Sequence, residues 1–327
     1  HWAFRHVYAH GAQSPYAGWY SIESFPIRRD PRPNYAAFAG CPYLPKLKHD
    51  NPEVREYLYG IARRWLDEGI DGWRLDVPFE VNHEFWRGFR DVVKGHDREA
   101  YIVGEVWELA TEWLAGDAFD GTMNYPWRRA ALRYASGAGD AAQLAAEMTA
   151  VRQATPPWAR PGMLNLLGSH DTERVASELG SDPFAVRLAV ALQMTSEGAP
   201  MVYYGDEVGL AGGADPANRG CMSWDRGRWD RDLLAWHRDL IRVRREHDAL
   251  RGPQDEFVSA PGGLLIRRRG SGTDAVHLVV NPTGTAVEVA DELLQGASRD
   301  LVTGAPIPGA PSRGRSVPAR SILLGVA

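Results

Sequence analysis

Between residues 50 and 251, apolar and polar positions follow a helical period and a strand period in turn. Helical spacing predicts helices over 51–69, 83–96, 110–116, 183–196 and 230–247, with further helical segments over 127–155. Short apolar runs between them predict strands over 70–76, 100–107, 119–125, 163–170 and 199–207. Strands that alternate with helices indicate a parallel α/β sheet, either open or closed into a barrel.

The two ends of the chain show other patterns. Residues 1–49 are rich in aromatic residues, proline and glycine without a sustained period, which predicts an excursion packed on a larger body. Residues 252–327 contain short alternating runs separated by glycine and proline, which predict a separate antiparallel β domain. We expect the three arginines at 267–269 to form a solvated face. The predicted organisation is therefore 1–49, 50–251 and 252–327.

Composition excludes several classes of protein. The 327 residues carry a formal net charge of −5 and no long basic run, so the sequence lacks the footprint of a nucleic-acid-binding protein. No stretch reaches the apolar length of a membrane span, and the first residues do not resemble a signal peptide, which favours a cytoplasmic protein. Because the sequence does not show the true N-terminus, secretion stays open as the alternative. Cys41 and Cys221 match no metal spacing; two free thiols are the simpler interpretation, and a single disulfide stays open.

Acidic and polar residues stand at the ends of the predicted strands. Asp76, Glu105, Asp171 and Asp206 each occur where a strand ends, and active sites of parallel α/β folds are built at the carboxyl ends of their strands. Arg74 lies on the same side of its strand as Asp76 because strand side chains alternate. From this segment alone, a structural ion pair and a polar catalytic cavity are equally good interpretations.

Three segments at these strand ends resemble the signature regions of the α-amylase superfamily of retaining glycoside hydrolases: GWRLD, GEVW and GSHDTER, in that order. The segments YLPKL (43–47) and YYGDEVGLAGGADPANRGCMSWD (203–225) resemble the neopullulanase, cyclomaltodextrinase and maltogenic amylase branch. The resemblance covers roughly residues 1–250. It implies a TIM (β/α)8 barrel, of which this chain holds the C-terminal five strands, followed by a small antiparallel β-sandwich.

The first signature of this family, an Asp followed four residues later by Asn-His, is absent. The chain lacks an initiator Met, and its first residues resemble the family segment on the C-terminal side of that signature. We therefore expect the first three barrel strands, and any N-terminal sugar-binding module, to lie upstream. Calcium sites of some relatives lie largely in that upstream part, so the resemblance implies no cofactor and no metal in this chain.

The resemblance implies three catalytic roles. Asp76 is the expected nucleophile, Glu105 the general acid and base, and Asp171 the residue that stabilises the transition state. A retaining glycosidase needs one carboxylate to attack the anomeric carbon and one carboxyl group to protonate the leaving oxygen, about 5 to 5.5 Å apart. Arg74 would keep Asp76 ionised and oriented, and His170 would bind the hydroxyl groups of the sugar with Asp171.

Other substrate-binding candidates have structural alternatives. Trp107 stacks on a leaving-side glucose or belongs to the core, and Asp215 with Arg219 holds a sugar beyond the cleaved bond or forms a loop ion pair. Phe79 and Glu108 stand where many relatives carry Asn and His. Both positions adjoin the expected acceptor sugars, so they leave open the balance between hydrolysis and transfer.

The leading hypothesis is a glycosidase that cleaves α-1,4 glucosidic bonds, with α-1,6 bonds as an extension, in maltodextrins, cyclodextrins or pullulan. A transglycosylase or glucan isomerase on the same scaffold is one alternative, because a sugar hydroxyl can replace water. A non-catalytic barrel relative is another. The expected partner is an α-glucan, with no nucleic acid and no membrane, and a homodimer is one option for assembly.

Overall fold

The computed structural model describes residues 1–307, 309–310 and 314–326. The chain divides into two compact units, which we describe separately. Unit 1 comprises His1–Val106 and Glu112–Asp120, and unit 2 comprises Trp107–Thr111 and Gly121–Ala327. The predicted domain 252–327 includes residues 308, 311–313 and 327, which lie outside the described residues.

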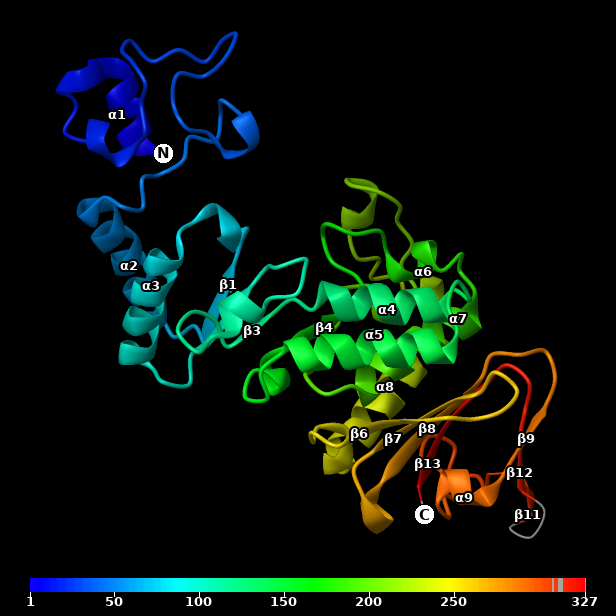
Figure 1. Ribbon diagram of the computed structural model, residues 1–327. Coiled ribbons are helices and arrows are strands. Elements are labelled where there is room, and N and C mark those ends of the chain that lie inside the picture. Colours follow the sequence, from blue (N-terminus) through cyan, green and yellow to red (C-terminus); the bar gives the residue numbers. More distant parts are fainter. Residues whose placement is uncertain (308, 311–313, 327) are drawn as a thin grey trace. The chain divides into compact units, whose positions relative to one another are not determined.

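Unit 1 is built from helices and two parallel strands. Its regular elements are α1 (Trp2–His10), α2 (Pro52–Asp67), β1 (Gly72–Leu75), α3 (His83–His96) and β2 (Tyr101–Gly104). Helices α2 and α3 lie side by side (Figure 1). Strands β1 and β2 pair in parallel from Gly72↔Tyr101 to Leu75↔Gly104. A Cβ atom on Gly72 would lie 2.0 Å from the Tyr101 carbonyl oxygen, so only glycine allows this close approach.

The N-terminal part of unit 1 is more regular than its composition predicts. Helix α1 buries Ala3, Phe4 and Val7 in a core with residues 19–35 and Val54 of α2. The apolar stripe of α1 is short and flanked by His and Tyr, which explains why the helical period is hard to see in the sequence.

Short 3-10 helices connect elements in both units: Gly11–Gln13, Ala17–Trp19, Phe38–Gly40, Pro78–Glu80, Thr111–Leu114, Arg160–Gly162, Asp206–Val208, Ala217–Arg219, Arg226–Arg228, Asp248–Leu250 and Gly272–Asp274.

Unit 2 begins with helices and short strands. Its elements up to residue 250 are β3 (Gly121–Thr122), α4 (Tyr125–Ala135), α5 (Ala141–Ala154), β4 (Leu164–Leu166), α6 (Val175–Glu178), α7 (Pro183–Thr195), β5 (Ala199–Met201) and α8 (Arg231–Glu246). Strands β4 and β5 pair in parallel, and Met123 forms a parallel bridge to Leu164. The predicted strands are present, but each is shorter than its apolar run. The predicted helix over 110–116 is a 3-10 helix, Thr111–Leu114.

The C-terminal part of unit 2 consists of antiparallel strands, drawn in gold to red in Figure 1. The strands are β6 (Asp255–Val258), β7 (Leu265–Arg269), β8 (Val276–Asn281), β9 (Val287–Val289), β10 (Arg299–Asp300), β11 (Gly309–Ala310), β12 (Gly314–Val317) and β13 (Ser321–Val326), with helix α9 (Asp291–Leu294). They form a sheet of order β10-β13-β8-β7-β6 and a second of order β11-β12-β9. Ile266, Val279, Val289 and Val317 bring both sheets into one apolar core, as in a sandwich.

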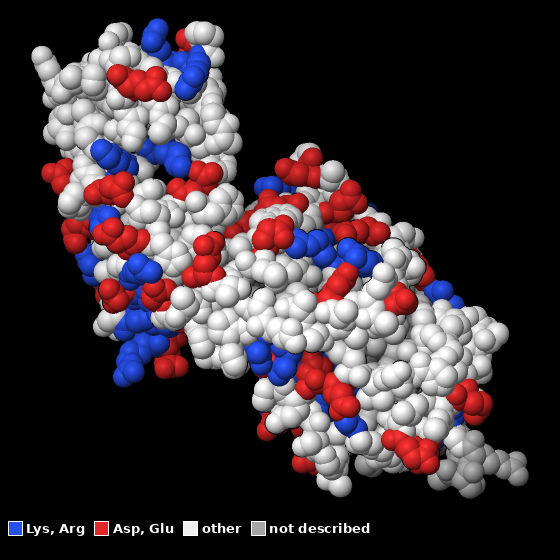
Figure 2. Space-filling model, viewed as in Figure 1, with Lys and Arg blue, Asp and Glu red and all other residues white. Residues whose placement is uncertain are grey.

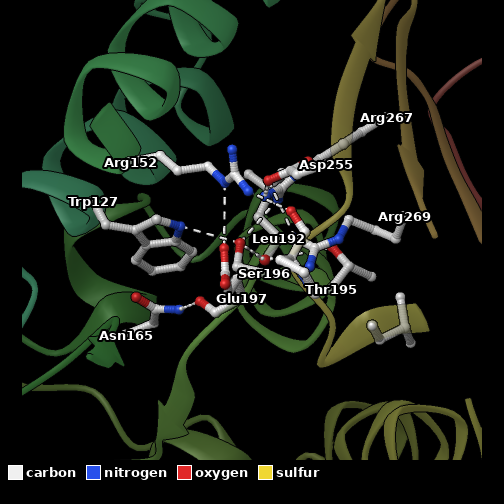
Figure 3. A network of polar contacts seen from close by, with 12 residues as sticks. Trp127, Arg152, Asn165, Leu192, Thr195, Ser196, Glu197, Asp255, Arg267 and Arg269 are labelled. Atoms are coloured by element: carbon white, nitrogen blue, oxygen red, sulfur yellow. Dashed lines mark hydrogen bonds and ion pairs between the residues drawn. The ribbon is translucent and has the colours of Figure 1, made fainter. Parts of the chain in front are cut away.

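A network of buried polar side chains joins the helical part of unit 2 to strands β6 and β7 (Figure 3). Asp255 accepts hydrogen bonds from Arg267 Nε (2.8 Å) and Nη2 (2.6 Å) and pairs with Arg269 Nη1 at 3.1 Å. Arg267 Nη1 also donates to Ser196 Oγ at 2.9 Å. Although burial alone would raise the pKa of Asp255, its attraction to Arg267 and Arg269 lowers that pKa below its ordinary value.

This network corrects the expectation of a solvated arginine face. Arg267 and Arg269 are 2% and 0% exposed, whereas Arg268 pairs with the exposed Glu256. The side chains of a strand alternate between its two faces, so positions 267 and 269 point inward together. The acidic partner Asp255 lies 12 residues before Arg267, on the neighbouring strand of the hairpin.

The charged surface of the described residues has no long basic run, as the sequence predicts, and the cysteines are not bonded to each other. Basic and acidic side chains are interspersed on the face drawn in Figure 2. Cys41 and Cys221 are free thiols. No helix among the residues that the structure describes is long and apolar enough to span a membrane.

Candidate active site

Asp76 and Glu105 come together in unit 1 because they directly succeed neighbouring parallel strands. Leu75 of β1 and Gly104 of β2 are register partners, and Glu105 N–H donates to the Leu75 carbonyl at 2.9 Å. The side chains of Asp76 and Glu105 therefore emerge at the same edge of the sheet. Arg74 Nη1 donates to Asp76 Oδ1, and Arg74 Nη2 lies 3.1 Å from Glu105 Oε2. One guanidinium thus bridges both carboxylates.

The two carboxylates have different environments. The Asp76 side chain is 71% exposed, whereas that of Glu105 is 5% exposed. The apolar neighbours Val103 and Val106 of Glu105 are buried as well. An open carboxylate beside an enclosed one matches the division of labour between a nucleophile that meets the substrate and an acid in a sheltered position.

Val77 is held in an unusual backbone conformation next to Asp76. Its φ is 36°, in the left-handed region that a β-branched residue rarely occupies, at a cost of about 1 to 3 kcal/mol. The Val77 N–H donates to Glu105 Oε2 at 3.3 Å. The turn after Asp76 therefore contacts the second carboxylate, and backbone outliers of this kind cluster at functional sites.

A cleft of about 630 Å³ in unit 1 contains Asp76, Arg74 and part of the YLPKL segment. Pro45 and Lys46 line it together with Glu80. Lys46 Nζ lies 2.6 Å from Glu80 Oε2, so this lysine ties the YLPKL segment to the 3-10 helix that comes after Asp76. Phe79 belongs to the same helix, Pro78–Glu80, and the residue is 57% exposed.

A second group of candidates lies together in unit 2. Asp171 Oδ2 lies 3.0 Å from His170 Nε2, and Asp171 Oδ1 lies 3.4 Å from Arg219 Nη2. Arg219 Nε also pairs with Asp215 Oδ1 at 2.9 Å. These side chains are all partly exposed, from 30% for Asp171 to 56% for Asp215. The four residues form a polar chain that can hydrogen-bond several hydroxyl groups.

Trp107 in unit 2 is both packed and accessible. Its ring stacks on Tyr125 with centroids 3.8 Å apart and an interplanar angle of 9°, yet the residue is 38% exposed. Arg129 fixes its backbone, donating to the Trp107 carbonyl at 2.8 Å and to Glu108 Oε2 at 2.9 Å. Glu108 is therefore engaged in an ion pair.

Asp206 is a buried acid that lies shortly after β5, at the start of the 3-10 helix Asp206–Val208. Burial raises its pKa to about 7, although Arg174 opposes that shift through a hydrogen bond and its charge. Arg174 Nη1 lies 3.2 Å from Asp206 Oδ1, and Arg174 is fully buried. This pair joins two chain segments in the interior, so Asp206 stabilises the end of its strand segment.

The sequence pattern did not single out Tyr125, Arg129, Arg174 or Asn218. Arg174 lies inside the segment GSHDTER, and Asn218 directly precedes Arg219, so both adjoin selected residues. Arg174 bonds to Asn218, 44 residues away, and Asn218 bonds to His170, 48 residues away, which explains why no local period reveals them.

Among the residues that the structure describes, no group of three or more His, Cys, Asp or Glu side chains could hold a metal ion.

Comparisons with known proteins identify the family of this chain. The family model described as "Alpha amylase, catalytic domain" matches residues 29–252. The chain belongs to the α-amylase family. Within this family it is 41% identical over 290 residues to a cyclomaltodextrinase of Geobacillus thermopakistaniensis, covering 88% of this chain and 49% of that protein. It is 48% identical over 244 residues to neopullulanase 2 of Thermoactinomyces vulgaris, covering 74% and 42%.

Solved structures of the α-amylase family extend the likeness to the whole chain. A cyclic α-maltosyl-(1→6)-maltose hydrolase from Arthrobacter globiformis, in complex with cyclic α-maltosyl-(1→6)-maltose, superposes with a TM-score of 0.90 at 40% identity. The match covers 100% of this chain and 72% of that one. Membership implies a TIM barrel with an additional sheet domain. The chain spans about half the length of the curated relatives that it matches.

Proposed function

We propose that this protein is a retaining glycoside hydrolase acting on α-1,4 glucosidic bonds of maltodextrins, cyclodextrins or pullulan, with α-1,6 bonds as an extension. The observation that carries the proposal is the guanidinium of Arg74, which bridges an exposed and a buried carboxylate at adjacent strand ends. Relatives named cyclomaltodextrinase and neopullulanase support the choice of α-glucans.

The reaction proceeds in two steps on the residues of this chain. In the first, an Asp76 carboxylate oxygen attacks the anomeric carbon while the Glu105 carboxyl group gives its proton to the glycosidic oxygen, so that the leaving sugar departs as an alcohol. In the second, Glu105 takes a proton from water, and the water oxygen replaces Asp76 on the anomeric carbon. Both steps pass through an oxocarbenium-like transition state and need no cofactor.

The remaining residues bind the sugar. Asp171 and His170 hydrogen-bond secondary hydroxyl groups, and these contacts strengthen as the ring flattens toward the transition state. Trp107 offers a stacking surface to a leaving-side glucose, Phe79 adjoins the acceptor sugars, and Asp215 with Arg219 holds a sugar beyond the cleaved bond. In this proposal the chain supplies the C-terminal five strands of the barrel, and residues 252–327 form a sandwich domain.

Glycosyl transfer is the second candidate, and Glu108 is the residue that raises it. This side chain is held by Arg129 where many relatives carry His, beside the position expected for an acceptor sugar. A sugar hydroxyl that enters in place of water gives a longer oligosaccharide. Analysis of the products from maltotriose separates the two, because transfer yields products longer than the substrate and hydrolysis does not.

Substitution of the two carboxylates tests the proposal, in protein expressed from the complete coding sequence. Asp76→Asn should retain less than about one per cent of the wild-type rate on maltotriose, since an amide cannot form the glycosyl ester. Glu105→Gln should retain its first step on an activated substrate such as a glycosyl fluoride, and azide should restore turnover. Asp76→Asn with ordinary activity, after exclusion of deamidation, contradicts the proposal.

A cytoplasmic location is proposed from the curated relatives. One of them, from Bacillus subtilis, is named an intracellular maltogenic amylase and is 39% identical over 246 residues, which supports a cytoplasmic location here. The proposed partner is an α-glucan oligosaccharide, and a homodimer stays an option. Cell fractionation tests the cytoplasmic location, and light scattering tests the homodimer.

A further inference from the structure

A buried side-chain amide holds the loop that carries Asp171. Asn218 is 0% exposed, and its Nδ2 donates to the carbonyl oxygens of His170 and Thr172, each at 2.8 Å. These carbonyls belong to the residues immediately before and after Asp171. The amide therefore holds the His170–Asp171 peptide group and the Thr172–Glu173 peptide group, which bracket Asp171.

Two further hydrogen bonds of this loop are local, and Ser169 Oγ also lies 3.3 Å from the Tyr125 hydroxyl group of α4. Ser169 Oγ accepts from the Asp171 N–H at 3.2 Å, and Thr172 Oγ1 accepts from the Ser169 N–H at 3.0 Å. The two local bonds shape the turn but do not attach it to another element. Asn218 comes from a different element, the 3-10 helix Ala217–Arg219, and so sets where the turn lies.

The same 3-10 helix also contacts the Asp171 carboxylate. Arg219 comes directly after Asn218, and its Nη2 lies 3.4 Å from Asp171 Oδ1. Adjacent residues of one short helix thus hold the backbone and the side chain of Asp171. A displacement of this helix would move both contacts together.

Arg174 anchors this helix in the interior. Its Nε donates to the Asn218 carbonyl at 2.8 Å, and its backbone N–H donates to the Gly212 carbonyl at 2.9 Å. Its Nη1 pairs with Asp206 and donates to the Tyr204 carbonyl. A Cβ atom on Gly212 would lie 2.6 Å from the Ala217 carbonyl oxygen, so the loop before the helix packs too closely for a larger residue.

We propose that Asn218 is a positioning residue of the reaction: its amide clamps the peptide groups that bracket Asp171 and so places that carboxylate against the transition state. The inference rests on the proposed function, in which Asp171 acts mainly as the bond to the anomeric carbon breaks. A displacement of about 1 Å in such a group can cost on the order of a hundredfold in rate. Binding of the ground-state sugar depends less on its exact place.

The kinetic test compares Asn218→Ala with a matched control in the same unit. Asn281 is also 0% exposed, and its Nδ2 donates to the carbonyls of Thr285 (2.8 Å) and Val317 (3.0 Å), within the C-terminal β strands. Asn218→Ala should lower kcat on a maltosyl fluoride on the order of a hundredfold with KM within about threefold. Asn281→Ala should lose comparable thermal stability without a change in kcat.

A double-mutant cycle separates positioning from general damage. If Asn218 acts through Asp171, Asn218→Ala combined with Asp171→Asn should be no slower than Asp171→Asn alone, within about threefold. Multiplication of the two single losses, or an Asn218→Ala variant as active as the wild type, overturns the proposal. Activity is measured per folded molecule, by active-site titration with a slow fluorinated substrate.

Hydrogen exchange tests the clamp without relying on activity. Amide exchange in residues 169–173 should be at least about tenfold faster in Asn218→Ala than in the wild type and unchanged in Asn281→Ala. Unchanged exchange in this loop refutes the clamp whatever the enzyme acts on. Faster exchange in a protein that cleaves no α-glucan leaves the clamp standing and refutes the proposed function instead.

Discussion

Asp255 offers a sharp test of the buried network in unit 2, because its neighbour on the same strand provides a matched control. Asp255 neutralises Arg267 and Arg269, and its side chain is only 6% exposed. Asp255→Asn keeps the shape but removes the negative charge, which leaves two buried guanidinium groups without their partner. Loss of one member of a buried ion pair costs about 3 to 5 kcal/mol.

The control is Glu256→Gln, the same change from carboxylate to amide one residue later. Glu256 pairs with Arg268 on the opposite face, and its side chain is 56% exposed. Exposed pairs contribute about 0 to 1 kcal/mol. The two variants should therefore differ by at least about 2 kcal/mol in free energy of unfolding, although they remove the same charge from the same strand.

Urea unfolding followed by circular dichroism measures this difference, and pH adds a second condition. The pKa of Asp255 is lowered in the folded state, so its contribution is present above the pKa of the unfolded chain and is lost as pH falls through the folded pKa. The gap between the wild type and Asp255→Asn should therefore narrow at acidic pH. Equal losses in Asp255→Asn and Glu256→Gln at neutral pH would refute the buried network.

The remaining predictions concern single side chains near the candidate site. Trp107→Ala should weaken sugar binding on the leaving side by roughly 1 to 3 kcal/mol in calorimetry with little change in melting temperature, whereas a large fall in melting temperature with normal binding would assign Trp107 to the core. Because the pKa of Asp206 is raised to about 7, its contribution to stability is full below the unfolded pKa and is lost as pH rises through 7. Between pH 5 and pH 8 the stability of the wild type should therefore fall by about 3 kcal/mol relative to Asp206→Asn, and parallel pH curves for the two proteins would contradict the raised pKa.

Elements with strong local signals could be predicted from the sequence. Helix α3 occupies the predicted range, His83–His96, because Asn82 caps it through Phe85 N–H at 2.8 Å and Phe85, Trp86, Phe89 and Val93 form its buried stripe. The sequence also allowed the prediction that Asp76 and Glu105 lie close together, because neighbouring parallel strands end at the same edge of a sheet.

Features that depend on distant partners could not be predicted. The three arginines at 267–269 look like a surface run until Asp255 is placed on the next strand, although strand alternation already puts positions 267 and 269 on one face. Asn218 belongs to no periodic pattern in the sequence. Its role depends on hydrogen bonds to two carbonyl groups of a loop that lies 46 to 48 residues away. Helix α1 is short, and much of its burial comes from contacts with residues 19–35.

The central claim is that Asp76 forms a covalent bond to the sugar. A fluorinated maltosyl fluoride that loads the enzyme faster than water releases it should add one fluorinated maltosyl group to the protein with loss of fluoride, and peptide mapping by mass spectrometry identifies the labelled side chain. The account predicts a single glycosyl ester on the peptide that contains Asp76, absent in Asp76→Asn. A label on another carboxylate, or turnover of the reagent with no covalent adduct and with inversion at the anomeric carbon, would contradict it.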